Sequence, residues 1–248
     1  MRIAADLHIH STLSPCASLE MSPAAIVRRA RELALDVIAV TDHNSVANGV
    51  TAAGLGEKAG VKVLLGMEAQ TREDIHVLCL FEDRGQAERF NGIIYSLLPD
   101  VDNNPDYFGD QVVVDEQDNI VRQETKLLLN ALDLPLLELV EMVRSHGGVS
   151  IPSHVEAPPY GLLVNLGMVP AELEDSLLEI SYATPARQAL KDFPDLKRHP
   201  LLRNSDAHFL KDIGRARTIF QSPSASLPAL VAAARAGAFQ VVYPGTDG

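Results

Sequence analysis

The chain has 248 residues, of which 46% are hydrophobic and 22% are charged, and its formal net charge is −12. This composition is typical of a globular domain with a large core, and the length suits a single α/β barrel. The acidic balance argues against binding to phosphate backbones, which are held by clustered Lys and Arg, so we expect no extended nucleic-acid surface.

Targeting signals and disulfides are also not expected. No apolar run reaches the roughly 18 residues of a membrane span, and residues 1–10 lack the apolar core of a signal peptide. The two cysteines, Cys16 and Cys79, cannot build a disulfide framework. The sequence therefore predicts a cytoplasmic protein without a membrane partner, and it gives no indication of the oligomeric state.

Short apolar runs alternate with helical patterns along the chain. In the first helix Ser22 is the expected N-cap, Pro23 takes the first position, and apolar residues from Ile26 to Ala34 form one stripe. A later helix over residues 136–145 ends before Gly147 and Gly148. Strands are predicted over residues 3–9, 36–41, 62–67, 75–81, 148–153, 177–181, 201–205 and 240–243. This alternation predicts a parallel sheet, and so many strands favour its closure into a barrel.

One polar segment, residues 100–124, interrupts the alternation and is rich in Asn and Asp. Its second half reads as a β-hairpin that turns at Asp118 and Asn119. We therefore interpret residues 100–124 as an insertion within the barrel.

Histidines and carboxylates gather where the predicted strands begin or end. Asp6, His8 and His10 alternate at the end of the first strand, so all three are expected on one face. Such a motif alone occurs often by chance, but here the pattern recurs. Its other members are Thr41-Asp42-His43, Gly66-Met67-Glu68, His76, His154 and Ser205-Asp206-Ala207-His208. In a parallel barrel the carboxyl ends of the strands meet at one mouth, so these residues predict a metal-binding active site.

At these motifs the sequence resembles the PHP (polymerase and histidinol phosphatase) family, and the resemblance spans most of the chain. It implies a distorted (β/α)7 TIM-like barrel formed by residues 1–248 as one domain, with residues 100–124 inserted. It also implies two to three divalent metal ions. Imidazole and carboxylate ligands suit zinc, manganese or iron and do not distinguish among them.

The resemblance also implies a ligand for each metal. His8, His10, Glu68 and Asp206 would bind the first ion, and Glu68 would bridge to a second ion held by His76 and His154. His43 and His208 would hold a third. Asp6 and Asp42 are expected behind the ligands, where they would orient imidazoles through the free N–H.

The chain departs from the family near the third metal. Many members have Asp or His five or six residues after the second His of the first motif, where this chain has Pro15 and Cys16. Either Cys16 supplies a thiolate, or water and substrate complete the site, or the site is weak. A small buried side chain in a loop is an equally good interpretation of Cys16.

The leading hypothesis is hydrolysis of a phosphoester in a small molecule or nucleotide, since adjacent metals activate water and bind phosphoryl oxygens. Asp206, His208 and His43 are the expected catalytic residues. The insertion would act as a lid, with Arg122 or Lys126 contacting the substrate phosphate. Two alternatives stay open: amidohydrolase-type C–N hydrolysis, and a non-catalytic metal-binding regulatory module.

Overall fold

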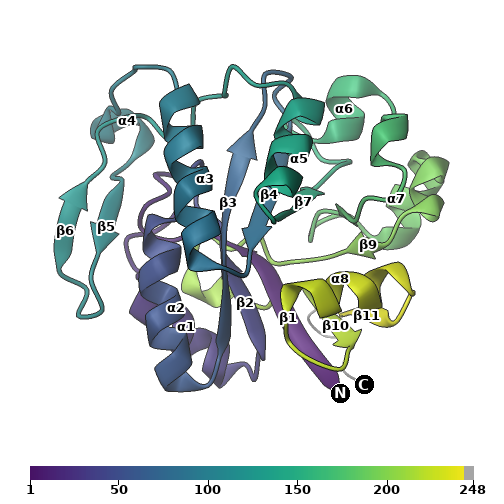
Figure 1. The fold of residues 1–248 in the computed structure, drawn as a ribbon, viewed down its shortest axis with the longest axis horizontal. Helices are drawn as coiled ribbons and strands as arrows, with labels where there is room; N and C mark the ends of the chain where they lie inside the picture. Colours follow the sequence, from purple (N-terminus) through teal and green to yellow (C-terminus); the bar gives the residue numbers. More distant parts are fainter. Residues whose placement is uncertain (243–248) are drawn as a thin grey trace.

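One seven-stranded sheet organises the chain, and it curls into a half-barrel within a mixed α/β fold (Figure 1). The computed structural model describes residues 1–242, and the spatial order of the strands there is β11-β10-β1-β2-β3-β4-β7. The strands are β1 (Arg2–Ile9), β2 (Val37–Val40), β3 (Lys62–Gln70), β4 (His76–Phe81), β7 (Val149–Pro152), β10 (Arg217–Gln221) and β11 (Phe239–Val242). Beside this sheet, β8 (Leu178–Glu179) and β9 (Leu201–Leu202) form a separate parallel pair.

The prediction of a wholly parallel sheet is wrong. Pairs β1–β2 and β2–β3 are parallel, whereas β3–β4, β4–β7, β1–β10 and β10–β11 are antiparallel. The reason is clearest between β3 and β4, which are joined by residues 71–75 alone. A parallel crossover needs about a dozen residues or more, so this short connection forces the chain to turn back.

Each predicted strand has a counterpart in the structure, although several are shorter. The strand predicted over residues 240–243 corresponds to β11, and its last residue, Tyr243, lies outside the described residues. Strand β10 was not predicted. It supplies the antiparallel neighbour of β1 and pairs Ile3 with Phe220.

The helices pack against this sheet. Ser22 caps α1 as predicted, because its hydroxyl accepts a hydrogen bond from the Ala25 amide at 3.2 Å. The α-helices are α1 (Pro23–Glu32), α2 (Ala47–Ala59), α3 (Arg84–Leu97), α4 (Pro105–Phe108), α5 (Leu136–Ser145), α6 (Leu162–Leu166), α7 (Ala186–Asp192) and α8 (Leu227–Arg235). Short 3₁₀ helices are η1 (Ala171–Leu173), η2 (Pro194–Arg198) and η3 (Leu210–Asp212). Among the described residues, no helix is both long and apolar enough to cross a membrane.

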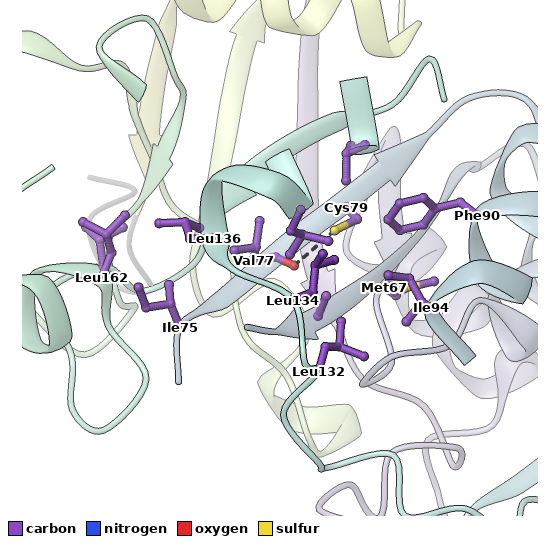
Figure 2. Packing of buried hydrophobic residues seen from close by; sticks show 14 of the residues in the cluster. Met67, Ile75, Val77, Cys79, Phe90, Ile94, Leu132, Leu134, Leu136 and Leu162 are labelled. Atoms are coloured by element: carbon purple, nitrogen blue, oxygen red, sulfur yellow. Dashed lines mark hydrogen bonds between the residues drawn. The ribbon is translucent and has the colours of Figure 1, made fainter. Parts of the chain in front are cut away.

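A large hydrophobic cluster fixes β3 and β4 against helix α3 (Figure 2). Met67 and Cys79 on the strands, and Phe90 and Ile94 on the helix, are all fully buried. Burying one such side chain contributes roughly 1.5–3 kcal/mol, so the cluster holds these strands firmly. Glu68 lies near the end of β3, and His76 is the first residue of β4.

Residues 100–124 contain the predicted hairpin, formed by β5 (Val112–Val114) and β6 (Ile120–Gln123). Asp118 in the turn adopts a left-handed backbone conformation, with φ of 62°. The hairpin lies beside α2 (Figure 1), where the Asn48 side chain donates to Val112 O at 3.0 Å and accepts from the Val114 amide at 3.1 Å. The insertion is therefore anchored on the side of the fold.

Candidate metal centre

Glu68, near the end of β3, is 1% exposed and lies at the centre of a ring of imidazoles. Its Oε1 atom faces His76 Nδ1 at 3.1 Å, His154 Nε2 at 3.1 Å and His8 Nε2 at 3.3 Å. Its Oε2 atom faces His10 Nε2 at 3.4 Å and His43 Nδ1 at 3.6 Å. One carboxylate therefore contacts five of the six histidines that the sequence assigned to the site.

The strand directions explain how distant residues reach this point. His76 is the first residue of β4 and pairs with Gln70 at the end of β3, because the two strands are antiparallel. The start of β4 therefore lies at the same edge of the sheet as the end of β3. At that edge His43 also bridges to Glu68 in parallel register.

Asp206 completes one side of the cluster. Its Oδ1 atom lies 3.5 Å from both His8 Nε2 and His10 Nε2. The Asp206 backbone is left-handed, with φ of 48°, a conformation rare for residues other than Gly, Asn and Asp. Arg215 supports this conformation, since its guanidinium donates to Ser205 O at 2.7 Å and to Asp206 O at 2.9 Å. Sequence reasoning did not identify Arg215, because nothing in its local pattern marks this contact.

Cys16 and His208 lie on the outer side of the cluster. Ligand atoms of His10, Cys16, His43 and His208 all lie within 4.8 Å of one another. Cys16 is exposed, whereas Cys79 is buried in the hydrophobic core. The structure thus brings all eight expected metal ligands together, and Cys16 with them.

The pKa values here follow from burial and from neighbouring charges. Burial raises the pKa of the Glu68 carboxyl, but the His76 and His8 imidazoles outweigh it and hold this pKa well below its usual range. Burial lowers the pKa of His43 well below its usual value, and lowers that of His208 to about 4. Both imidazoles are therefore neutral near neutral pH, the form in which imidazole binds a metal.

The residues fit divalent metal ions. Among the described side chains, His43 Nδ1 and His76 Nε2 are buried nitrogens without a hydrogen-bond partner. Leaving such a group unpaired costs about 1–3 kcal/mol, and ligation would remove that cost. Ligand atoms of His8, His10 and Glu68 lie within 4.8 Å of one another, as do those of His43, Glu68 and His76. Imidazole with carboxylate is a donor set for zinc, manganese or iron.

The two aspartates expected behind the ligands bind differently from the prediction. Asp6 accepts hydrogen bonds from the backbone amides of Ser205 at 2.9 Å and Gly214 at 2.8 Å, so it orients no imidazole. In the same stretch, the pairing of β1 with β2 shifts register between Asp6 and Ile9. Asp6 instead ties β1 to the segment that carries Asp206.

Asp42 acts on an imidazole only through a serine. It accepts a hydrogen bond from the Ser14 hydroxyl at 2.7 Å, and that hydroxyl lies 2.9 Å from His10 Nδ1. Behind the ligands, the carboxylate that touches a ligand imidazole directly is that of Glu179, which the sequence analysis missed. Its Oε1 atom lies 3.0 Å from His8 Nδ1. The available signal was a lone carboxylate inside the apolar run Leu177–Ile180.

A cavity of about 420 Å³ opens over the cluster. No Lys or Arg is among the described residues that line it. Tyr160 forms part of the wall and stacks on His76, with 4.1 Å between ring centroids. Neither Arg122 nor Lys126 lines this cavity. Arg122 pairs with Glu124 at 3.4 Å, and the Lys126 ammonium lies 5.2 Å from the Tyr95 ring centroid.

The chain matches two family models. The PHP domain model matches residues 6–147, and the PHP-associated model matches residues 192–239. The DNA polymerase III PolC-type of Oceanobacillus iheyensis is 41% identical over 69 residues, which make up 28% of this chain and 5% of that protein. An uncharacterized protein of Methanocaldococcus jannaschii is 37% identical over 89 residues, or 32% of this chain and 52% of that protein. These matches therefore span at most about half the length of either relative.

Solved structures share the fold. The lesion-specific endonuclease EndoQ from Pyrococcus furiosus superposes with a TM-score of 0.69 and 20% identity, over 97% of this chain and 58% of that one. A structure from Bifidobacterium adolescentis, described as a metal-dependent phosphoesterase, superposes with a TM-score of 0.59 and 18% identity. That superposition covers 82% of this chain and 87% of the other.

The expectation of no extended nucleic-acid surface is contradicted. Endonuclease Q, with a TM-score of 0.66 to this chain at 20% identity, has been solved with a 27-mer duplex whose abasic lesion lies at the active site. That superposition covers 95% of this chain and 57% of the endonuclease. The expectation rested on a net charge of −12, which describes the whole chain and not the charge at any one surface.

Proposed function

Because this chain belongs to the PHP domain family, we propose that it is a hydrolase that uses bound metal ions to cleave phosphoester bonds. One observation carries the proposal: Glu68 is buried and lies within 3.6 Å of five imidazoles. When bound, the metals would supply an activated water and polarise the phosphoryl oxygens.

The ligands divide into two groups around Glu68. His8 and His10 both lie 3.5 Å from Asp206 Oδ1 and, with Asp206 and Glu68, would hold a first ion, although His8 faces the same Glu68 oxygen as the second group. His76 and His154 both contact Glu68 Oε1 at 3.1 Å and would hold a second ion. A carboxylate with imidazoles on both of its oxygens is suited to bridge two ions, and this geometry supports the assignment made from the family resemblance.

The charge balance supports binding of an anion through the metals. The cavity wall has no Lys or Arg among the described residues, and the formal charge of the chain is −12. A phosphate would therefore be repelled unless bound cations supply the local positive charge. Amidohydrolase-type C–N hydrolysis has less support, because the described residues that line the cavity include no lysine to form a carbamate ligand.

We assign roles toward the substrate to three residues that line the cavity, Asp206, His208 and His43. Asp206 and His208 have side chains 26% exposed, whereas the Glu68 side chain is 2% exposed. A leaving oxygen in the cavity can therefore approach Asp206 and His208, and its proton would come from solvent, because the lowered pKa values of these two groups leave the carboxylate ionised and the imidazole neutral near neutral pH. His43 lines the same wall and would help to bind the phosphate.

We propose a phosphoester of a small molecule or nucleotide as the substrate, because the cavity of about 420 Å³ is of the size that holds such ligands. The test is phosphate release or strand cleavage from sugar phosphates, mononucleotides and DNA duplexes with an abasic site, each with added manganese or zinc. Glu68→Gln is the matched control and should be inactive. Turnover of amides or lactones without any phosphoester cleavage would overturn the proposal. Tight metal binding without any turnover would indicate a regulatory module.

A further inference from the structure

Cys16 lies among the candidate metal ligands, and its side chain is not part of the hydrophobic core. It is exposed and lines the cavity with His43 and His208. Ligand atoms of His10, Cys16, His43 and His208 are mutually within 4.8 Å. Cys79 offers the contrast, since its thiol is fully buried beside Met67 and Phe90 and contacts Val77 O at 3.6 Å (Figure 2).

His10 is not available as a ligand in this group of four residues, because both of its ring nitrogens have other contacts. Its Nδ1 atom is bonded to Ser14 Oγ at 2.9 Å, and its Nε2 atom faces Glu68 and Asp206 at 3.4 and 3.5 Å. Both nitrogens are therefore committed elsewhere. Cys16, His43 and His208 are left as a set of three.

His43 lies between this set of three and Glu68. The residue is 5% exposed, and its Nδ1 atom has no hydrogen-bond partner in the described structure and faces Glu68 Oε2 at 3.6 Å. On the other side, His208 Nδ1 lies 3.0 Å from Asp206 O, which leaves Nε2 available. The backbone also joins the two outer segments, because the Ser18 amide donates to His208 O at 2.9 Å. The loop that carries Cys16 is thereby held against His208.

We propose that Cys16, as a thiolate, binds a metal ion with His43 and His208, and that this ligand makes the site prefer zinc to manganese. The inference rests on the metal centre of the proposed function and deepens it. Thiolates favour zinc, whereas manganese favours oxygen ligands. These three residues would hold the ion, and a zinc ion with three protein ligands would keep one coordination position for a substrate oxygen, as catalytic zinc sites do. The thiol proton passes to solvent when the ion binds.

Cobalt titration of the metal-free protein tests the thiolate directly, because a cobalt–thiolate bond produces a near-ultraviolet charge-transfer band. We expect the band in the wild-type protein and in Cys79→Ser, and its loss in Cys16→Ser. Dialysis against equal concentrations of zinc and manganese, followed by elemental analysis, tests the preference. Cys16→Asp should exchange zinc for manganese at this site, while the metals held around Glu68 stay unchanged.

The outcomes separate this inference from the proposed function. Cobalt binding without the band, or a band that survives in Cys16→Ser, overturns the thiolate site and leaves the Glu68-centred hydrolase standing. Equal zinc preference in wild type and Cys16→Asp overturns the selectivity. Failure to bind any divalent ion overturns both proposals. Circular dichroism checks that each variant folds, and Cys16→Asp provides the readout if Cys16→Ser does not fold.

Discussion

The Nδ1 atom of His8 lies 3.0 Å from Oε1 of Glu179, and both side chains are buried. Asn204 holds the other carboxylate oxygen, since its amide donates to Glu179 Oε2 at 2.6 Å. With Nδ1 engaged in this way, His8 presents Nε2 to Glu68 at 3.3 Å. Glu179 therefore fixes the ring orientation of a metal ligand without reaching the metal itself.

Replacing Glu179 by Gln should weaken metal binding by roughly 10- to 100-fold, the usual effect of losing a carboxylate behind a ligand imidazole. Competition with a chelating dye measures the affinity. Glu124→Gln is the matched control, because Glu124 is a buried carboxylate that contacts Tyr95 and no imidazole. Equal affinities in the two variants would show that Glu179 does not position His8.

Glu68→Ala should lower the metal content of the purified protein more than His208→Ala does. Glu68 faces five imidazoles and is placed to bridge two ions, whereas His208 is placed at the outer site only. Elemental analysis of both variants gives the comparison directly. Equal losses would mean that Glu68 does not bridge.

Chelation should lower the thermal stability of the wild-type protein. An ion that binds only the folded chain stabilises it by about 2.7 kcal/mol at a free concentration of 100 times Kd. Differential scanning calorimetry with and without added zinc or manganese should therefore show a higher Tm with metal. The increase should be smaller in Glu68→Gln, because that variant keeps only the outer site of Cys16, His43 and His208. An equal increase in both proteins would indicate that the ions bind without Glu68.

Arg122→Ala should leave kcat and KM unchanged for any substrate that the enzyme turns over. The Arg122 side chain is 56% exposed and pairs with Glu124 on the hairpin, away from the cavity wall. A change in KM of more than twofold would show that Arg122 contacts the substrate, and it would support a lid role for residues 100–124.

The sequence predicted the family and the clustering of the metal ligands, because strand ends are marked by local patterns. His8 and Glu68 lie near the ends of β1 and β3, and the parallel strands β1, β2 and β3 bring their carboxyl ends to one edge of the sheet. The family assignment is confirmed by the match over residues 6–147. The individual metal assignments stay predictions.

What the sequence could not supply were contacts made only in three dimensions. Glu179 sits in a two-residue strand, and its partner His8 is 171 positions away. Strand β10 was missed because its five residues begin with Arg217 and end with Gln221, which dilutes the apolar pattern. Asp206 has a left-handed backbone and its carbonyl accepts a hydrogen bond from Arg215, and no local sequence pattern predicts either feature.

The short connection between β3 and β4 limits how the chain can vary in length. Within it the Thr71 amide donates to Ile75 O at 2.9 Å, and the Asp74 amide donates to Thr71 O at 3.0 Å. Adding or deleting one residue here would slide β4 by one position along β3, and a one-residue slip turns each side chain to the opposite face. His76 would then leave Glu68, so we expect natural relatives to accept insertions in the hairpin of residues 112–123 but not in this turn.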